Sequence, residues 1–228
     1  MNALRLIRIL QFGDSVLPVG AFAFSSGVES AIQHGVIRDV TTLADFTRDA
    51  LRQAATGDAR AVASCCRALT QDDRPRVLAH DRMLVNRRLN EEGRVMLTRM
   101  GKKMAEMAAE ITGDERTLWW LAQIRKGATP GSWPITQALV MSSLNTRPRE
   151  VVATHLYGVA MAQLSAALRL MRITHIEIQK ILFELNLDIE ALCDLAEQED
   201  VHQMASYAPV AEILAALHVK AFTRLFSN

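Results

Sequence analysis

Residues 151–171 constrain the fold more than any other segment, because they follow a helical pattern with almost no polar face. Apolar side chains recur at helical spacing and alternate with small ones: His155, Leu156, Val159, Met161, Leu164, Leu168 and Met171, then Gly158, Ala160, Ala162, Ser165, Ala166 and Ala167. A helix that is apolar all round must be buried. Small side chains also let neighbouring helices approach closely. We therefore expect this segment to be the central helix of a bundle.

The rest of the chain also follows a helical period, and no stretch alternates as a strand would. We expect helices over Ser25–His34, from Thr42 to about Ala55, over Ala59–Leu69, 76–111, Glu177–Glu197 and Val210–Phe226, with further starts near Pro75, Asp114 and Pro148. Thr42 with Asp45 resembles a capping box. We expect a break or bend near Gly93, and a loop over Lys126–Pro134. The sequence therefore predicts an all-α fold, one helical domain over 1–228 with about 8–11 helices around a central apolar helix.

Composition indicates a globular chain and excludes several kinds of partner. Half of the 228 residues are hydrophobic, 22% are charged and the formal net charge is +1. Nothing in that charge calls for nucleic acid or a membrane surface. No apolar run reaches the roughly 18 residues of a membrane helix, and the first residues lack the features of a signal peptide. We expect a cytoplasmic protein in which Cys65, Cys66 and Cys193 are reduced and buried.

The chain carries no recognisable catalytic pattern. Phosphate-binding glycine loops and the common hydrolase and zinc motifs are absent from the sequence. None of the six histidines has an acidic or histidine partner at helical spacing that would make a convincing metal pair. Glu91 and Glu92 lie among arginines, which is typical of a solvated charged face. We therefore expect no catalytic residue, no cofactor and no bound metal, and interpret the chain as an interaction protein.

One string near the start is more specific. Phe12–Glu29 reads FGDSVLPVGAFAFSSGVE. It resembles the N-terminal signature of the UreF family of urease accessory proteins, and it matches at Ser15, Leu17, Pro18, Val19, Gly20, Phe22, Ser25, Gly27 and Glu29. A turn leading into a helix explains these residue types, with Pro18 and Gly20 shaping the turn and Ser25 or Ser26 capping the helix. Such a turn does not explain why the whole string matches the family signature.

Four later stretches are similar to the same family in the same order, so the resemblance covers residues 4–227. They are Arg88–Gly101, Gly131–Gln137, Ala167–Leu182 and His218–Ser227. The third matches at Arg169, Leu170, Gln179 and Leu182. It departs at Arg172 and Thr174-His175, where the family has proline and glycine-glutamine, and the fourth departs at Val219.

The resemblance implies partners rather than chemistry. It implies an all-α homodimer that binds the accessory protein UreD (UreH in some organisms), recruits the GTPase UreG and engages apo-urease for nickel delivery. Glu29, Arg169 and Gln179 become candidate contacts to UreG. An arginine on an otherwise apolar helix is costly unless it is paired or points outward, so an internal ion pair or a surface position is the alternative for Arg169.

A second set of candidates would contact UreD/UreH or a second copy: Phe24, Phe222, Arg224 and Phe226. Phe24 falls in an expected loop, where an exposed aromatic ring suggests a partner and packing on the chain's own core is the alternative. The expected helix Val210–Phe226 carries two apolar stripes roughly 100° apart. One core covers about one stripe, so we predict that Phe222 and Phe226 pack against a partner. The alternative is that both rings lie in the chain's own core.

Two hypotheses from other classes stay open on the sequence alone. One is a ligand-binding helical enzyme of the haem-oxygenase-like type, which colour or metal analysis would reveal. The other is a helical adaptor unrelated to urease, which neighbouring urease structural genes would argue against.

Overall fold

The structure, a computed structural model, describes residues 3–89, 91–198, 201–205, 213, 214, 217, 225 and 226, without the side chain of Phe22. Within these residues it contains eleven α-helices with described bounds, three short 3-10 helices and no strand, and residues 213, 214 and 217 are helical as well. The prediction of an all-α fold is confirmed. The α-helices are α1 (Ala3–Gly13), α2 (Val28–Gln33), α3 (Val40–Thr56), α4 (Asp58–Thr70), α5 (Arg74–Asn86), α6 (Glu91–Thr112), α7 (Glu115–Arg125), α8 (Trp133–Ser143), α9 (Pro148–Leu170), α10 (His175–Leu185) and α11 (Ile189–Glu197), and the 3-10 helices are η1 (Ala21–Ala23), η2 (Asn186–Asp188) and η3 (Val201–Gln203).

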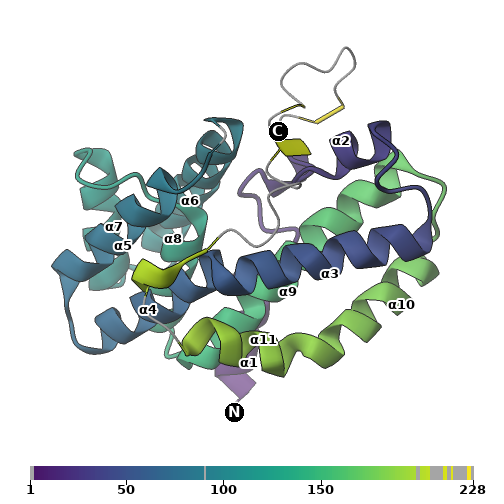
Figure 1. Cartoon of the computed structure of the whole chain (residues 1–228). Helices are drawn as coiled ribbons and strands as arrows, with labels where there is room; N and C mark the ends of the chain where they lie inside the picture. The colour runs from purple at the N-terminus through teal and green to yellow at the C-terminus, as the bar shows by residue number, and fades with distance from the viewer. Residues whose placement is uncertain are drawn as a thin grey trace.

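Helix α9 is central, as predicted. It contacts α1, α2, α3, α4, α8, α10 and α11, and Figure 1 shows it crossing the molecule beside α3. Its aliphatic side chains from Val151 to Leu164 are largely buried. His155 is buried too, with Nδ1 2.9 Å from Oε1 of Gln137. Burial lowers the pKa of His155, so this ring is neutral in the core.

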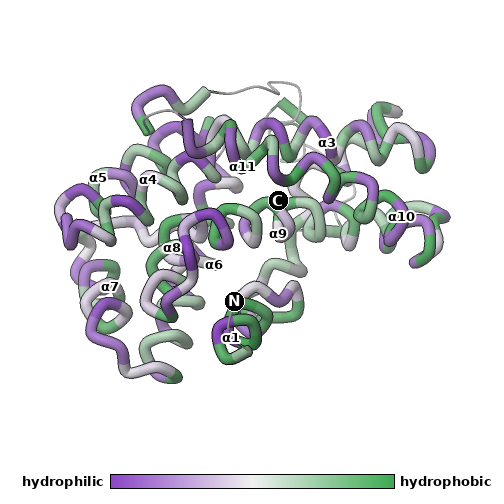
Figure 2. Tube along the Cα trace, turned by 90° about the horizontal axis from the view of Figure 1, so that it is seen from below, coloured by the Kyte–Doolittle hydropathy of each residue, from purple (hydrophilic) through white to green (hydrophobic). Residues whose placement is uncertain are grey.

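Helix α8 is a second core helix that the sequence did not reveal. Every residue from Pro134 to Met141 is buried, and the helix packs against α4, α6, α7 and α9. We expected a loop as far as Pro134, but α8 already begins at Trp133, with the proline in its first turn. Proline fits there because the first helical N–H needs no partner within the helix. The hydropathy trace in Figure 2 shows α8 and α9 as largely hydrophobic segments inside the bundle.

Two predicted boundaries were wrong, and the break expected near Gly93 lies slightly earlier in the chain. The cap of α3 is Asp39, whose carboxylate accepts from the N–H of Thr42 at 2.8 Å, so the helix starts before the predicted Thr42–Asp45 box. The break between α5 and α6 lies before Glu91, and Gly93 is helical. The helix predicted over Glu177–Glu197 is two helices, α10 and α11, separated by the 3-10 turn η2.

The loop between α7 and α8 is held by one buried carboxylate and one close backbone contact. Asp81 of α5 is fully buried, and it accepts hydrogen bonds from Thr129 Oγ1 at 2.6 Å, Gly131 N at 2.7 Å and Ser132 N at 2.8 Å. Gly101 of α6 lies against the same stretch, because a Cβ placed there would be 2.1 Å from the carbonyl oxygen of Gly131. These two residues fix the loop against α5 and α6.

The three cysteines are free and buried, as predicted. Burial raises the pKa of Cys66 and of Cys193 to about 11. Of the described helices, only α9 is long and apolar enough to cross a bilayer on length and composition. Half of the relevant window is buried inside the protein, and a core helix passes the same test.

Candidate partner-binding site

The site begins at the turn that leads into α2. Ser26 and Gly27 both have a positive φ, 52° and 86°, which reverses the chain just before the helix. Glycine adopts that conformation at no steric cost. The N-cap of α2 is Gly27, without a side-chain cap, so the expected cap by Ser25 or Ser26 was wrong. Ser25 Oγ does accept from the backbone N–H of Glu29 at 3.3 Å. The turn places Glu29 in the first turn of α2, with only 2% of its surface exposed.

The Glu29 carboxylate binds backbone from the other end of the chain. Oε1 accepts from the N–H of Leu225 at 2.8 Å, and Oε2 accepts from the N–H of Phe226 at 3.2 Å. Residues 225 and 226 thus lie beside α2, where Figure 1 draws a short yellow segment. Hydrogen bonds to an ionised acceptor are about twice as strong as neutral ones. A buried carboxylate also needs such partners, so Glu29 is an anchor for the main chain at 225–226.

Arg169, in the last turn of α9, completes the site from the opposite side. Its Cζ atom lies 4.0 Å from the centroid of the Phe226 ring, within the range of a cation–π interaction. Its Nε donates to the carbonyl of Ser165 at 3.5 Å. Partial burial lowers the pKa of Arg169, but the group stays charged because arginine starts from so high a value.

These contacts suit the binding of a short peptide segment. The two oxygens of the Glu29 carboxylate accept hydrogen bonds from two consecutive main-chain N–H groups. The guanidinium of Arg169 lies over the aromatic ring of the second of these residues. In this structure the bound segment is the chain's own Leu225–Phe226, with Leu225 exposed and Phe226 buried in the large core cluster. The described residues contain no group of three or more His, Cys, Asp or Glu side chains that could hold a metal.

The structure brings together three of the predicted contacts: Glu29, Arg169 and Phe226. In this chain the Phe226 ring lies in its own core, which was the alternative stated for it. Its packing against a partner stays a prediction, and that prediction now requires the ring to leave Arg169. Phe222 and Arg224 lie outside the described residues, as does most of the helix expected over Val210–Phe226.

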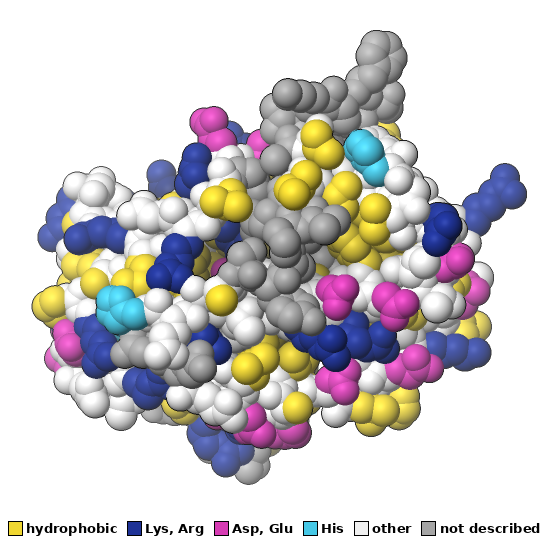
Figure 3. All heavy atoms as spheres, viewed as in Figure 1, with side chains coloured by type: hydrophobic (Ala, Val, Ile, Leu, Met, Phe, Trp, Pro, Cys, Tyr) yellow, Lys and Arg dark blue, Asp and Glu magenta, His cyan; other side chains and the backbone are white. Residues whose placement is uncertain are grey.

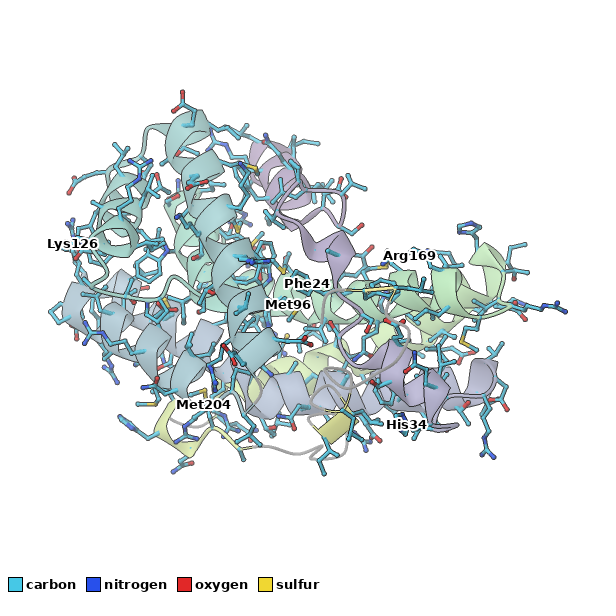
Figure 4. The ribbon with its side chains drawn as sticks, turned by 90° about the horizontal axis from the view of Figure 1, so that it is seen from above. Phe24, His34, Met96, Lys126, Arg169 and Met204 are labelled. Atoms are coloured by element: carbon cyan, nitrogen blue, oxygen red, sulfur yellow. The ribbon has the colours of Figure 1, made fainter. Side chains whose placement is uncertain are left out.

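Phe24 follows η1 in a loop, as expected, and its ring packs on the chain's own core, which was the alternative stated for it. The ring is buried in a second apolar cluster with Phe12, Val19, Met100, Met104, Ala108, Val140 and Leu144. Figure 4 shows Phe24 next to Met96 of α6, with Arg169 to one side. The ring packs on apolar side chains of α6 and α8, and such burial of an aromatic ring is strongly favourable. A contact from Phe24 to a partner therefore stays untested.

Gln179 is exposed on α10, and no described contact joins it to Glu29 or Arg169.

A nearby residue, at which the sequence departs from the family pattern, has a clear structural role. Thr174, which replaces the family's glycine, caps α10 through a capping box with Glu177. Sequence reasoning missed this cap, although a Thr three residues before a Glu is its usual signal.

The described fold and site define an all-helical protein that holds a peptide segment between a carboxylate and a guanidinium. Comparison with known proteins gives the family. The family model described as UreF matches residues 37–186. Proteins named urease accessory protein UreF from Photorhabdus laumondii, Yersinia enterocolitica and Yersinia pseudotuberculosis are 61%, 58% and 57% identical over the full length of both chains. This chain belongs to the UreF family of urease accessory proteins. That assignment replaces the two hypotheses from other classes.

Proposed function

We propose that this protein is a non-catalytic scaffold in urease maturation. It binds UreD (or UreH), and the pair recruits the GTPase UreG to apo-urease, where GTP hydrolysis drives nickel delivery. The proposal includes a homodimer and a cytoplasmic location. A scaffold can couple partner binding to hydrolysis only if it binds one nucleotide state of the GTPase more tightly than the other.

The strongest support for this proposal is that Glu29 and Arg169 both contact Phe226. Each was selected from a separate motif, and about 140 and 57 residues separate them along the chain, yet their side chains and backbone form one site. A site that holds its own segment through main-chain bonds and one ring also suits a similar segment of a partner. We assign UreG recruitment to Glu29, Arg169 and Gln179. We assign contact with UreD/UreH or with a second copy to Phe24, Phe222, Arg224 and Phe226.

Replacing Arg169 with alanine should weaken UreG recruitment by about tenfold or more, which corresponds to 1.4 kcal/mol. Folding and UreD binding should persist, because a cation–π contact at an exposed arginine contributes only about 0.5–1 kcal/mol to stability. The measurement is a titrated pull-down of UreG by the chain in complex with UreD, beside thermal unfolding of the chain alone.

The control is Arg172→Ala. Arg172 is exposed three residues further on, and it takes part in no described ion pair or hydrogen bond. We expect wild-type recruitment for this variant. If Arg169→Ala recruits UreG as well as Arg172→Ala does, Arg169 only holds the chain's own Phe226 and its assignment to UreG is wrong.

A further inference from the structure

Helix α10, together with the 3-10 turn η2 that continues it, presents apolar side chains to solvent. Ile176, Phe183 and Leu187 are 70%, 74% and 77% exposed. At 100° per residue these three positions lie within about 40° of one another, so they form one row along the helix. The opposite side of α10 is buried and packs against α3 and α9, so the fold does not use this row. Exposed apolar patches usually mark interaction sites.

A row of carboxylates runs beside the apolar row. Each of the three apolar residues is followed directly by an acidic one: Glu177, Glu184 and Asp188. The stretch His175–Glu197 contains six acidic side chains and one lysine, a net charge of −5, although the whole chain carries +1. Figure 3 shows hydrophobic and acidic side chains next to one another at the lower right of the molecule, where Figure 1 places α10.

The chain neutralises these carboxylates only in part. Arg149 pairs with the three acidic residues of α11, at 2.6, 2.8 and 3.0 Å. Arg48 lies 3.9 Å from Asp188, and Glu184 takes part in no described ion pair or hydrogen bond. Two arginines thus face a stretch whose own charge is −5, and the surface around the apolar row stays acidic.

This charge selects the kind of partner that can cover the row. A membrane surface carries anionic headgroups, and helices that lie on it are rich in Lys and Arg. A second copy, related by a two-fold axis through this face, would bring two acidic rows together, and like charges across an interface are unfavourable. A different protein with an apolar groove and Lys or Arg on its rim satisfies both rows.

We propose that α10 and η2 insert the row of Ile176, Phe183 and Leu187 into an apolar groove of such a basic protein. Amphipathic helices bind in this way, through anchors at helical spacing. Phe183 is the middle member of the row and the main anchor, because aromatic rings dominate contacts of this kind. The proposal rests on the proposed function, since it takes the partner from the proteins of that assembly. Gln179, which is assigned there to a partner, lies beside the same row.

Phe183→Ala tests the anchor. Purified UreD, UreG and apo-urease are each titrated with the full-length chain by calorimetry. The affinity for one of them should fall by at least about tenfold, and the melting temperature should stay the same because the ring is exposed. The control Leu89→Ala, at a 76% exposed position outside α10, should bind like the wild type. Equal affinities of the two variants for all three proteins would overturn the proposal.

Glu184→Gln tests the charge on the rim. The association rate with the same partner is measured by surface plasmon resonance at increasing NaCl concentration. Salt should slow association of the wild-type chain, and it should slow the variant less, because charges at the rim act mainly through the association rate. The same salt dependence for both chains would contradict a basic partner.

Measurements on the chain alone exclude the other occupants. Wild type and Phe183→Ala should show the same association state in sedimentation equilibrium. A loss of self-association in the variant would mean that the row binds a second copy, and binding to anionic phospholipid vesicles that Phe183→Ala abolishes would mean that it binds a membrane. Either result would overturn the proposal. A wild-type chain that binds none of the three proteins would contradict the proposed function as well, whereas normal binding that is unchanged in Phe183→Ala contradicts only the docking of α10.

Discussion

Replacing Gly101 with alanine should lower the free energy of unfolding by about 3 kcal/mol. The new Cβ would lie 2.1 Å from the Gly131 carbonyl oxygen, and 2.5 and 2.7 Å from the backbone of Ser132. Backbone atoms cannot rotate away as the end of a side chain can, so α6 and the loop before α8 must separate. For a chain of this size the melting temperature should fall by roughly 6–12 °C.

Gly158→Ala is the matched control, since both glycines lie within long helices. No atom lies within 4 Å of a Cβ placed at Gly158. Alanine is the better helix former, so we expect this variant to be more stable by about 0.5–1 kcal/mol. Thermal and urea unfolding of both variants measure the difference. Equal stabilities would mean that α6 does not approach the loop as closely as described.

Replacing Asp81 with alanine should cost about 3–4 kcal/mol of stability. The loss leaves the Thr129 hydroxyl and the N–H groups of Gly131 and Ser132 without their acceptor inside the protein. Asp81→Asn should also destabilise, because its amide N–H₂ would face donors where a carboxylate oxygen now accepts.

The control for Asp81 is Asp49→Ala, at an exposed position on α3 with no described hydrogen bond or ion pair. Surface changes of this kind stay within about 0.5 kcal/mol of the wild type. Urea unfolding at constant pH measures both variants. If Asp81→Ala unfolds at the same urea concentration as Asp49→Ala, the buried carboxylate does not hold the loop.

Sequence periodicity was enough to predict the fold class and α9, but not α8. The apolar residues of α9 continue for more than 20 residues, and only a buried helix explains such a run. Helix α8 is short, and its Thr136 and Gln137 look like surface residues. They are buried because they bind other core side chains: Thr136 Oγ1 accepts from Trp120 Nε1 at 2.9 Å, and Gln137 contacts His155. Pairings between distant positions leave no periodic signal.

It was harder to predict which side chains face solvent than where the helices lie. The Leu4, Ile7, Leu10 stripe was visible in the sequence, but nothing there showed that it faces solvent. Phe24 looked like an exposed loop ring, and the packing of α6 and α8 decided otherwise. The motif residues Glu29 and Arg169 could be selected by resemblance. Their common neighbour, the backbone at 225–226, could not, since a carboxylate that binds main-chain N–H groups requires no particular residue type there.

The nickel content of urease tests the central claim most directly. Urease would be produced with UreD and UreG, either without this chain, with the wild-type chain, or with Glu29→Gln, and nickel per active site measured in the purified enzyme. We expect background nickel without the chain, full occupancy with the wild type, and a strong reduction with Glu29→Gln, since an amide is a weaker acceptor for the N–H groups that the site binds. Full nickel occupancy without the chain would contradict a role in urease maturation. Full occupancy with Glu29→Gln would contradict the role assigned to this site.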